Sequence, residues 1–327
     1  MKVFINKRIP EIGIDMLKQA GLQIIFPDHE NITNEEWLEY CKTADVLLSI
    51  GGDFRYDKTF FETCSNIKAI ALYSVGFDHV DIKEAVQRNI PIGNTPDVLS
   101  KATSDVAFLL MQSVARRASY NFQKVKDGHW DVFDPLHALG QELYGKTLGI
   151  LGLGRIGFEM AKKSRKAFDM NILYHNRHRN EEAEKELGAT YVSFEELIAN
   201  SDVLSVHANY TPEQKDLFNR SVFEKMKSNA IFINTARGGF QHEKDLHEAL
   251  VSKQIWGAGL DVTNPEPMSP DNPLLELSNV CVLPHIGSAT IEARNGMAKL
   301  AAENIIAFSK GEEMPYCANP EVYIQHS

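Results

Sequence analysis

Three side chains that carry acid–base or anion-binding chemistry follow predicted strands in the second half of the chain. Arg237, Glu266 and His285 each come shortly after an apolar run typical of a buried strand. Because parallel strands end at a shared edge, we expect the three to lie together. An arginine binds a carboxylate, a histidine protonates a forming alkoxide, and a carboxylate orients the imidazole and favours its charged form. The set predicts hydride transfer to a 2-oxo acid, although singly each residue also fits an ordinary structural role.

A glycine-rich turn predicts where the hydride carrier binds. The apolar run Leu148–Leu151 leads into the residues GLGRIG, and a helix is predicted at 158–168. Gly152 permits the tight turn, Gly154 lets the backbone approach a pyrophosphate, and Gly157 allows close packing of helix and strand. The N–H groups and positive dipole end of the helix suit phosphate charge. The stretch therefore predicts dinucleotide binding.

The next strand, predicted at 171–174, ends in a basic loop that bears on which dinucleotide is used. Asn176 lies 19 residues after Gly157, where NAD-binding units usually place an acid that bonds the ribose. Here Arg177 and Arg179 follow instead, and arginines pair with a ribose 2′-phosphate. The pattern favours NADP(H) over NAD(H), and a solvated basic loop is the other interpretation.

A glycine-containing loop in the first half is a weaker candidate site. Tyr73–Asp78 follows a strand predicted at 68–72, so it lies at a strand end, where ligands bind in such sheets. Backbone N–H groups near Gly76 are open to a carboxylate because no side chain blocks them. From this pattern alone, an ordinary strand-to-helix turn is the better interpretation.

Composition excludes several classes of protein. The 327 residues are 43% hydrophobic and 24% charged, as in an ordinary globular protein of about two domains. The net charge of −10 argues against nucleic acid as a partner. The four cysteines are scattered, which predicts reduced thiols and no metal site. There is no leader-like apolar segment and no run of about 18 apolar residues, so we expect a cytoplasmic protein without membrane contact.

Alternating strands and helices predict an α/β protein with two doubly wound parallel sheets. A flavodoxin-like substrate (catalytic) domain is expected at 1–98 plus 288–327, because this part lacks a glycine-rich turn, and a Rossmann-type NAD(P)-binding domain at 99–287. Helices predicted at 100–117 and 294–309 carry the chain between them, with the active site expected in the cleft. Strands are expected at 2–6, 22–26, 44–49, 68–72, 148–151, 171–174, 202–206, 230–234, 257–261 and 280–283.

The segment 121–144 is aromatic and is expected to be irregular. Its residues include Trp130, Phe133 and Leu136. Such a segment either packs on a partner subunit or caps the core of its own domain. The density of aromatic residues favours the partner subunit.

Taken together, these motifs resemble the D-isomer-specific 2-hydroxyacid dehydrogenase family over nearly the whole chain, and most closely its glyoxylate/hydroxypyruvate reductases. The resemblance to those reductases rests on SVGFDH at 74–79, on HNR at 175–177 and on the lack of an appended regulatory domain. The motifs that carry the family resemblance are YSVGFD at 73–78, NTPDVL at 94–99, GLGRIG at 152–157, NTARG at 234–238, GLDV at 259–262 with Glu266, and PHIGS at 284–288.

The resemblance implies a role for each matching residue. Arg237 is expected to bind substrate, His285 to be the acid/base and Glu266 to be the partner of that histidine. The amides of Val75 and Gly76 are expected to cradle the substrate carboxylate. The expected cofactor-binding residues include the residues of the glycine-rich turn and of the basic loop. The full set is Thr103, Gly152, Gly154, Arg155, Ile156, Gly157, Asn176, Arg177, Arg179, His207, Ala208, Ala236, Asp261 and Gly287.

Some positions depart from the family pattern. HANYT at 207–211 replaces the usual H-x-P-L-T, which bears on the adenine side of the pocket. FQHE at 240–243 replaces the usual V-D-E/Q run, close to the substrate arginine. The arm at 130–140 matches no single subfamily, so the size of the substrate stays open.

The resulting hypothesis is an enzyme that reduces glyoxylate or hydroxypyruvate to glycolate or D-glycerate with NADPH, as a homodimer. Two alternatives remain: a reductase of a larger 2-oxo acid such as 2-ketogluconate, and a non-catalytic dinucleotide-sensing interaction protein. Compact length and the lack of long disordered extensions favour the enzyme. Turnover itself separates the alternatives.

Overall fold

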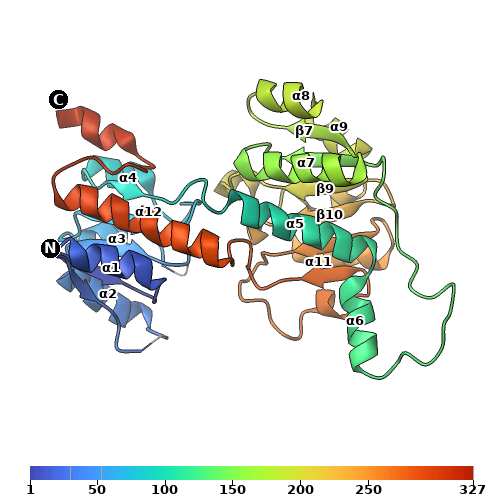
Figure 1. Cartoon of the computed structure of the whole chain (residues 1–327), viewed down its shortest axis with the longest axis horizontal. Helices are drawn as coiled ribbons and strands as arrows, with labels where there is room; N and C mark the ends of the chain where they lie inside the picture. The colour runs from blue at the N-terminus through green and yellow to red at the C-terminus, as the bar shows by residue number, and fades with distance from the viewer. Residues whose placement is uncertain (30, 53, 327) are drawn as a thin grey trace. The chain divides into compact units, whose positions relative to one another are not determined.

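The computed structural model describes residues 1–29, 31–52 and 54–326. Contacts divide the chain into two compact units, which Figure 1 shows in ribbon form. Their bounds are Met1–Leu99 with Ala289–Ser327, and Ser100–Ser288. Within the described ranges, no helix has the length and apolar character needed to cross a bilayer.

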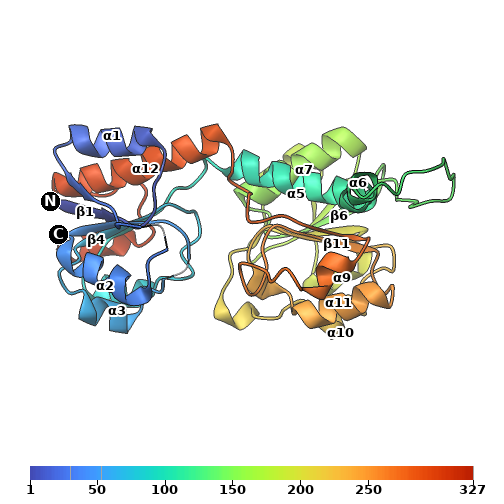
Figure 2. The same ribbon diagram turned by 90° about the horizontal axis from the view of Figure 1, so that it is seen from below.

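The first unit is built on a five-stranded parallel sheet with the order β2-β1-β3-β4-β5. Figure 2 shows α1 and α12 on one face of this sheet and α2 and α3 on the other. The strands are β1 Lys2–Ile5, β2 Gln23–Ile25, β3 Val46–Ser49, β4 Ala69–Leu72 and β5 Ile92–Gly93. The helices are α1 Glu11–Gln19, α2 Asn34–Thr43, α3 Lys58–Thr63, α4 Ile82–Gln87 and α12 Ile291–Ser309, with a short 3-10 segment, η4, at Pro320–His326.

Close helix packing joins the two ends of the chain within the first unit. Helix α1 lies against α12, and a Cβ at Gly13 would stand 2.8 Å from the carbonyl oxygen of Ala298. Strands β3 and β4 are buried along their whole length, as expected for apolar strands covered on both faces. The C-terminal helix is thus part of the fold of the N-terminal sheet.

The second unit holds a seven-stranded parallel sheet with the order β12-β11-β10-β9-β6-β7-β8. The strands are β6 Thr147–Leu151, β7 Asn171–His175, β8 Thr190–Tyr191, β9 Val203–Val206, β10 Ile231–Asn234, β11 Gly257–Leu260 and β12 Val280–Val282. The helices are α5 Ser100–Ala115, α6 Ala118–Lys126, α7 Arg155–Phe168, α8 Glu181–Leu187, α9 Phe194–Asn200, α10 Arg220–Phe223 and α11 Glu243–Val251; 3-10 turns lie at Pro212–Gln214, Gly238–Phe240 and Pro273–Glu276.

Strand β6 lies between β7 and β9, so the strand order reverses beside it. In open parallel sheets, ligands bind outside the carboxyl ends of the strands at such a switch point. Helices α5 and α7 cover one face of the sheet and α9, α10 and α11 cover the other (Figure 2). An apolar core fills each face: Leu148, Ile150 and Met160 belong to one, and Phe218 and Phe232 to the other.

The predicted fold class, two doubly wound parallel-sheet domains, is confirmed. Local structure differs in several places, among them a strand at Ile92–Gly93 that was not predicted and helix α12, which begins at Ile291 and not at 294. The segment expected to be irregular from 121 begins within α6, which runs to Lys126. The helix expected at 158–168 begins three residues earlier, at Arg155. Helices α4 and α8 were not predicted because they are short; each begins at a side-chain cap, Asp81 and Asn180 respectively.

Candidate active site

The glycine-rich turn has the geometry that its sequence requires. Gly152 follows β6 with a φ of +92°, and a Cβ there would stand 2.4 Å from the backbone nitrogen of Ala208. A Cβ at Gly157 would stand 2.5 Å from the carbonyl oxygen of Gly152. A side chain at either position therefore collides with backbone. The turn packs directly against the segment that follows β9, at the switch point of the sheet.

The start of helix α7 is open to an anion. Gly154 is its N-cap residue and provides no side-chain hydrogen bond, and a Cβ on Gly154 would meet no atom within 4 Å. The first turn of α7 carries no acidic residue. Because the first N–H groups of a helix have no partner inside it, a phosphate suits this position.

The basic loop that follows β7 is anchored to the glycine-rich turn. The amide nitrogen of Leu153 donates to Oδ1 of Asn176 at 2.6 Å, and Nδ2 of Asn176 returns a bond to the Leu153 carbonyl at 3.3 Å. Nδ2 of Asn180 donates to the same carbonyl at 2.9 Å. Both ends of the loop are thereby fixed beside the predicted phosphate position, with Arg177 and Arg179 between them.

The two loop arginines have different surroundings. Arg179 donates from Nε and Nη2 to the Glu184 carboxylate at 3.0 and 2.8 Å, and it lies over the ring of Tyr191. Arg177 is exposed, and no residue in the described part of the chain forms a hydrogen bond or ion pair with it. Charge and spacing in the sequence did not distinguish the two arginines, whereas the family resemblance implied that Asn176 and Arg177 meet the 2′-phosphate.

Three further predicted cofactor residues meet at the ends of strands β11 and β12. The carboxylate of Asp261 accepts hydrogen bonds from the amides of Ile286 and Gly287, both at 2.8 Å. A Cβ at Gly287 would stand 3.1 Å from Oδ2 of Asp261 and 3.2 Å from Cγ2 of Thr103. Burial raises the pKa of Asp261, and the two amide hydrogen bonds offset this only in part.

His207 and Ala236 complete the predicted cofactor edge. Burial lowers the pKa of His207 to about 3, so its imidazole is neutral near pH 7; its Nε2 lies 2.8 Å from the Ser205 hydroxyl. The amide of Ala236 donates to Oδ1 of Asn234 at 2.9 Å. Thr235, which directly precedes Ala236, has a buried hydroxyl with no hydrogen-bond partner among the described residues. An unpaired buried polar atom at this strand end is consistent with a site that binds a polar ligand.

The three predicted catalytic side chains are brought together. Nδ1 of His285 and Oε1 of Glu266 share a hydrogen bond that is also an ion pair when the imidazole is charged. Burial favours a higher pKa for Glu266, but the hydrogen bond and charge of His285, with the charge of Arg237, outweigh it and lower that pKa. Glu266 is therefore ionised near pH 7.

Backbone constraints hold two of these residues. His285 has a φ of +53°, which is uncommon for a residue with a side chain, and its amide donates to the Asp261 carbonyl at 2.9 Å. The Arg237 carbonyl accepts from Nδ2 of Asn234 at 2.8 Å, and Nδ2 also bonds to Gln241. Strained backbone persists where the surroundings fix it, often at functional sites. Asn234 and Gln241 were not predicted to support the site.

The Val75–Gly76 loop lies in the first unit and presents free amides. No described residue accepts a hydrogen bond from the N–H of Val75 or Gly76. The loop is braced through its carbonyls instead: Oγ of Ser74 donates to Gly76 at 2.7 Å, and Nδ2 of Asn94 to Val75 at 3.0 Å. The amide of Thr95 donates to the Ser74 carbonyl at 2.9 Å. The NTP motif thus shapes this loop, a role that its sequence alone did not suggest.

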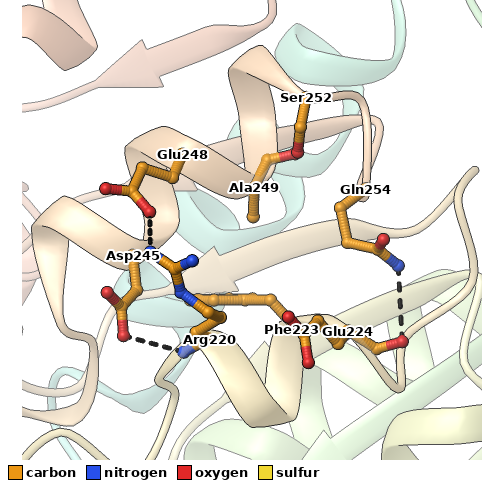
Figure 3. A pocket seen from close by; sticks show the side chains of 8 residues that line it. All are labelled: Arg220, Phe223, Glu224, Asp245, Glu248, Ala249, Ser252 and Gln254. Carbon is orange, nitrogen blue, oxygen red and sulfur yellow. Dashed lines mark hydrogen bonds and ion pairs between the residues drawn. The ribbon is translucent and has the colours of Figure 1, made fainter.

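A surface hollow elsewhere in the second unit contains none of the predicted site residues. It has a volume of about 200 Å³, and Figure 3 shows Arg220 bonded there to Glu248 and, through its backbone, to Asp245. Its arginine is already paired, so the hollow offers no free cation to a ligand. Among the described residues, no group of three or more histidine, cysteine or acidic side chains could hold a metal ion.

The fold and this arrangement define the chain as a dinucleotide-dependent dehydrogenase. The sequence model of the D-isomer specific 2-hydroxyacid dehydrogenase NAD-binding domain matches residues 108–287. A glyoxylate reductase from Thermococcus litoralis is 44% identical over 325 residues, which is 98% of this chain and 97% of that protein. The chain therefore belongs to the D-isomer-specific 2-hydroxyacid dehydrogenase family, a family of NAD(P)-dependent enzymes, as its motifs predicted.

Solved structures agree with this assignment. The TT0316 protein of Thermus thermophilus superposes with a TM-score of 0.90 at 38% identity, covering 97% of this chain and 100% of that one. An NADPH-dependent glyoxylate/hydroxypyruvate reductase from Sinorhizobium meliloti, solved with NADP and malonate, gives a TM-score of 0.84 at 28% identity, covering 98% and 97% of the two chains.

Proposed function

We propose that this enzyme reduces glyoxylate or hydroxypyruvate to the 2-hydroxy acid, with NADPH as the preferred reductant. The main support is the His285–Glu266 pair together with Arg237, all at the carboxyl edge of adjacent strands β10, β11 and β12. The glyoxylate reductase relatives and the NADP-bound neighbour support the substrate class and the cofactor.

The residues around the glycine-rich turn fit a nicotinamide dinucleotide. The amides of Gly154, Arg155 and Ile156 are proposed to bind the pyrophosphate at the uncapped start of α7. Asp261 and Thr103 are proposed to lie on the nicotinamide side, where Asp261 bonds the carboxamide. When bound, the cofactor supplies a hydride to C2 of the 2-oxo acid.

His285 is proposed to supply the proton that completes the reduction. As C2 gains a hydride, the carbonyl oxygen gains negative charge, and the protonated imidazole donates its proton to that oxygen. Ionised Glu266 accepts a hydrogen bond from Nδ1–H, which fixes the ring and stabilises its positive charge. The C=O double bond thereby becomes a CH–OH group, and the neutral imidazole is reprotonated from solvent.

Arg237 is proposed to bind the carboxylate of the substrate and to polarise its carbonyl. A guanidinium group forms two parallel hydrogen bonds with a carboxylate. The amides of Val75 and Gly76 are proposed as further donors to a carboxylate, which is supported by their lack of an acceptor among the described residues. Both sets of donors favour a substrate with a free carboxylate.

The preference for NADPH rests on the loop after β7. Asn176 replaces the acid that would repel a 2′-phosphate, and exposed Arg177 lies in a loop tied to Leu153 of the glycine-rich turn. We propose that Arg177 pairs with the 2′-phosphate. A guanidinium pairs well with a charged phosphate and gains much less from an uncharged ribose hydroxyl.

The proposal predicts rapid oxidation of NADPH by glyoxylate and hydroxypyruvate, and slower oxidation of NADH. Initial rates should be measured with both cofactors against these two acids, pyruvate and 2-ketogluconate. Arg177→Ala should raise KM for NADPH about tenfold or more and leave KM for NADH unchanged, because a charged hydrogen bond to phosphate is lost.

Lys185→Ala is the matched control, since it removes one exposed positive charge in α8, close in sequence. If Arg177→Ala and Lys185→Ala have the same small effect, the basic loop is only a solvated surface. Preferential turnover of 2-ketogluconate would assign a larger substrate. Nucleotide binding without turnover of any acid would instead favour a sensing protein.

We further propose a homodimer formed through the arm after α6. The apolar side chains of this arm are exposed in the single chain: Trp130 by 76%, Phe133 by 89% and Leu136 by 77%. Contiguous exposed apolar groups of this size usually mark an interface. The double replacement Trp130→Ser, Phe133→Ser is expected to convert dimer to monomer, as measured by light scattering after size exclusion. Val251→Ser, also at an exposed apolar position of the second unit, is the control and should stay dimeric.

A further inference from the structure

Glu184 holds the second arginine of the basic loop in a two-point contact. Nε of Arg179 donates to Oε1 of Glu184 at 3.0 Å, and Nη2 donates to Oε2 at 2.8 Å. These bonds, with one from Tyr174, lower the pKa of Glu184, so its carboxylate is ionised near pH 7. The Nε–Nη2 edge of the guanidinium, which could otherwise form a two-point contact with a phosphate, is thus occupied by a carboxylate of the same chain.

The position of Glu184 is set by buried structure. The hydroxyl of Tyr174, a fully buried side chain of β7, donates to Oε1 of Glu184 at 2.6 Å. The same hydroxyl accepts a bond from the amide of Asn180 at 2.8 Å, and the Asn180 side chain caps α8 and bonds to Leu153. The Glu184 side chain is 22% exposed, whereas that of Arg179 is 63% exposed. The carboxylate is therefore an acceptor fixed by buried structure, and the arginine is the more exposed partner that it holds.

Because of this contact, the two arginines of the loop differ in whether their charge is paired. Arg177 has no partner in the described part of the chain, whereas Arg179 is neutralised by Glu184. A ribose 2′-phosphate at the loop would meet one unpaired guanidinium, and it would also lie near the Glu184 carboxylate. An ion pair with an exposed arginine adds little to stability, so stability alone does not explain why the acid is braced here.

We propose that Glu184 is a specificity-determining residue that limits the preference for NADPH by keeping Arg179 from the 2′-phosphate. The proposal rests on the function proposed above, in which this loop binds that phosphate. Glu184 acts through Arg179 and is thus a positioning residue. Its presence leaves the enzyme able to use NADH, because only Arg177 discriminates between the two cofactors.

The test is Glu184→Gln, which keeps an acceptor for Tyr174 and removes the charge that holds Arg179. The ratio of kcat/KM for NADPH to that for NADH should rise by about three- to tenfold, the range expected when one exposed charge pair is exchanged for another. The affinity for 2′,5′-ADP, measured by calorimetry, should rise by a similar factor, and that for 5′-AMP should not change. Glu181→Gln removes an equal charge from the same turn of α8 and should change neither value.

The double variant Glu184→Gln, Arg179→Ala shows whether the gain depends on Arg179. It should return both the kcat/KM ratio and the affinity for 2′,5′-ADP to their wild-type values. An unchanged or lower ratio in Glu184→Gln, with a melting temperature equal to that of wild type, would overturn the proposal. If the melting temperature of Glu184→Gln is lower than that of wild type, the single variant Arg179→Ala is the test. A large loss of 2′,5′-ADP affinity in this variant would mean that Arg179 already binds the phosphate, against the proposal. No loss of affinity would support the proposal. Failure of the proposed function would show separately, as an Arg177→Ala variant with unaltered NADPH affinity.

Discussion

His285→Ala should lower kcat for reduction of glyoxylate by about 10²–10⁴-fold, the usual contribution of a general acid. The alkoxide that forms at C2 would then take its proton from water. The dissociation constant for NADPH should change little, because the imidazole of His285 is not among the groups proposed to bind the cofactor, and the proposed phosphate contacts follow β6 and β7. Stopped-flow measurement of a single turnover separates this chemical step from product release.

His178→Ala is a suitable control, because His178 is an exposed imidazole in the basic loop with no assigned role in proton transfer. Equal turnover in wild type and His285→Ala would eliminate His285 as the proton donor. The φ of +53° at position 285 is relevant to the choice of replacement. Alanine keeps the residue non-glycine and retains the backbone strain, so a change in kcat reports the loss of the imidazole.

The strand ends could be predicted from the sequence, and with them the sheet edge at which most of the candidate site residues lie. Apolar runs followed by Arg237, Glu266 and His285 placed these residues at one sheet edge, because parallel strands end together. The contact between Glu266 and His285 needed more than this. It depends on the path of the loop from 262 to 266 and on the unusual φ at 285, and neither has a periodic signal in the sequence.

Side-chain partners were the part that sequence reasoning did not supply. Charge and spacing made Arg177 and Arg179 look equivalent, and only the folded α8 places Glu184 against the second of them. A signal was present, since Asn180 followed by acidic residues is typical of a helix start. Recognising that helix would have placed a carboxylate next to the loop, although it would not have revealed the brace from Tyr174.

The loop that presents Val75 and Gly76 illustrates the same limit. Its glycine suggested only an ordinary turn, and the resemblance to the family gave it a role. The structure adds a physical reason for its shape, because Asn94 and Ser74 bond to its carbonyls and leave its amides without acceptors among the described residues. Bonds between residues about twenty positions apart arise from the pairing of β4 with β5 and cannot be deduced from local pattern.

Arg237→Ala should lower kcat/KM for glyoxylate by about 10³-fold or more, because a donor that acts on the developing oxyanion contributes about 10²–10³ in rate and the carboxylate contact is lost as well. Arg237→Lys keeps the positive charge and loses the planar two-point contact. It should recover only part of the activity, since an ammonium group cannot bind a carboxylate through two parallel bonds. Steady-state rates over a range of glyoxylate concentrations give both values.

Two controls make this result specific to the guanidinium group. Arg220→Lys alters an arginine of the same unit that is paired with Glu248 in the hollow of Figure 3, and it should leave kcat/KM unchanged. Added guanidine should restore part of the activity of Arg237→Ala, which a purely structural role would not allow.

Because the charge of Arg237 also helps to lower the pKa of Glu266, loss of Arg237 weakens the ionisation of that carboxylate. The activity of Arg237→Ala should therefore fall off at a higher pH on the acid side than that of wild type, and an identical acid limb would show that the two groups act independently.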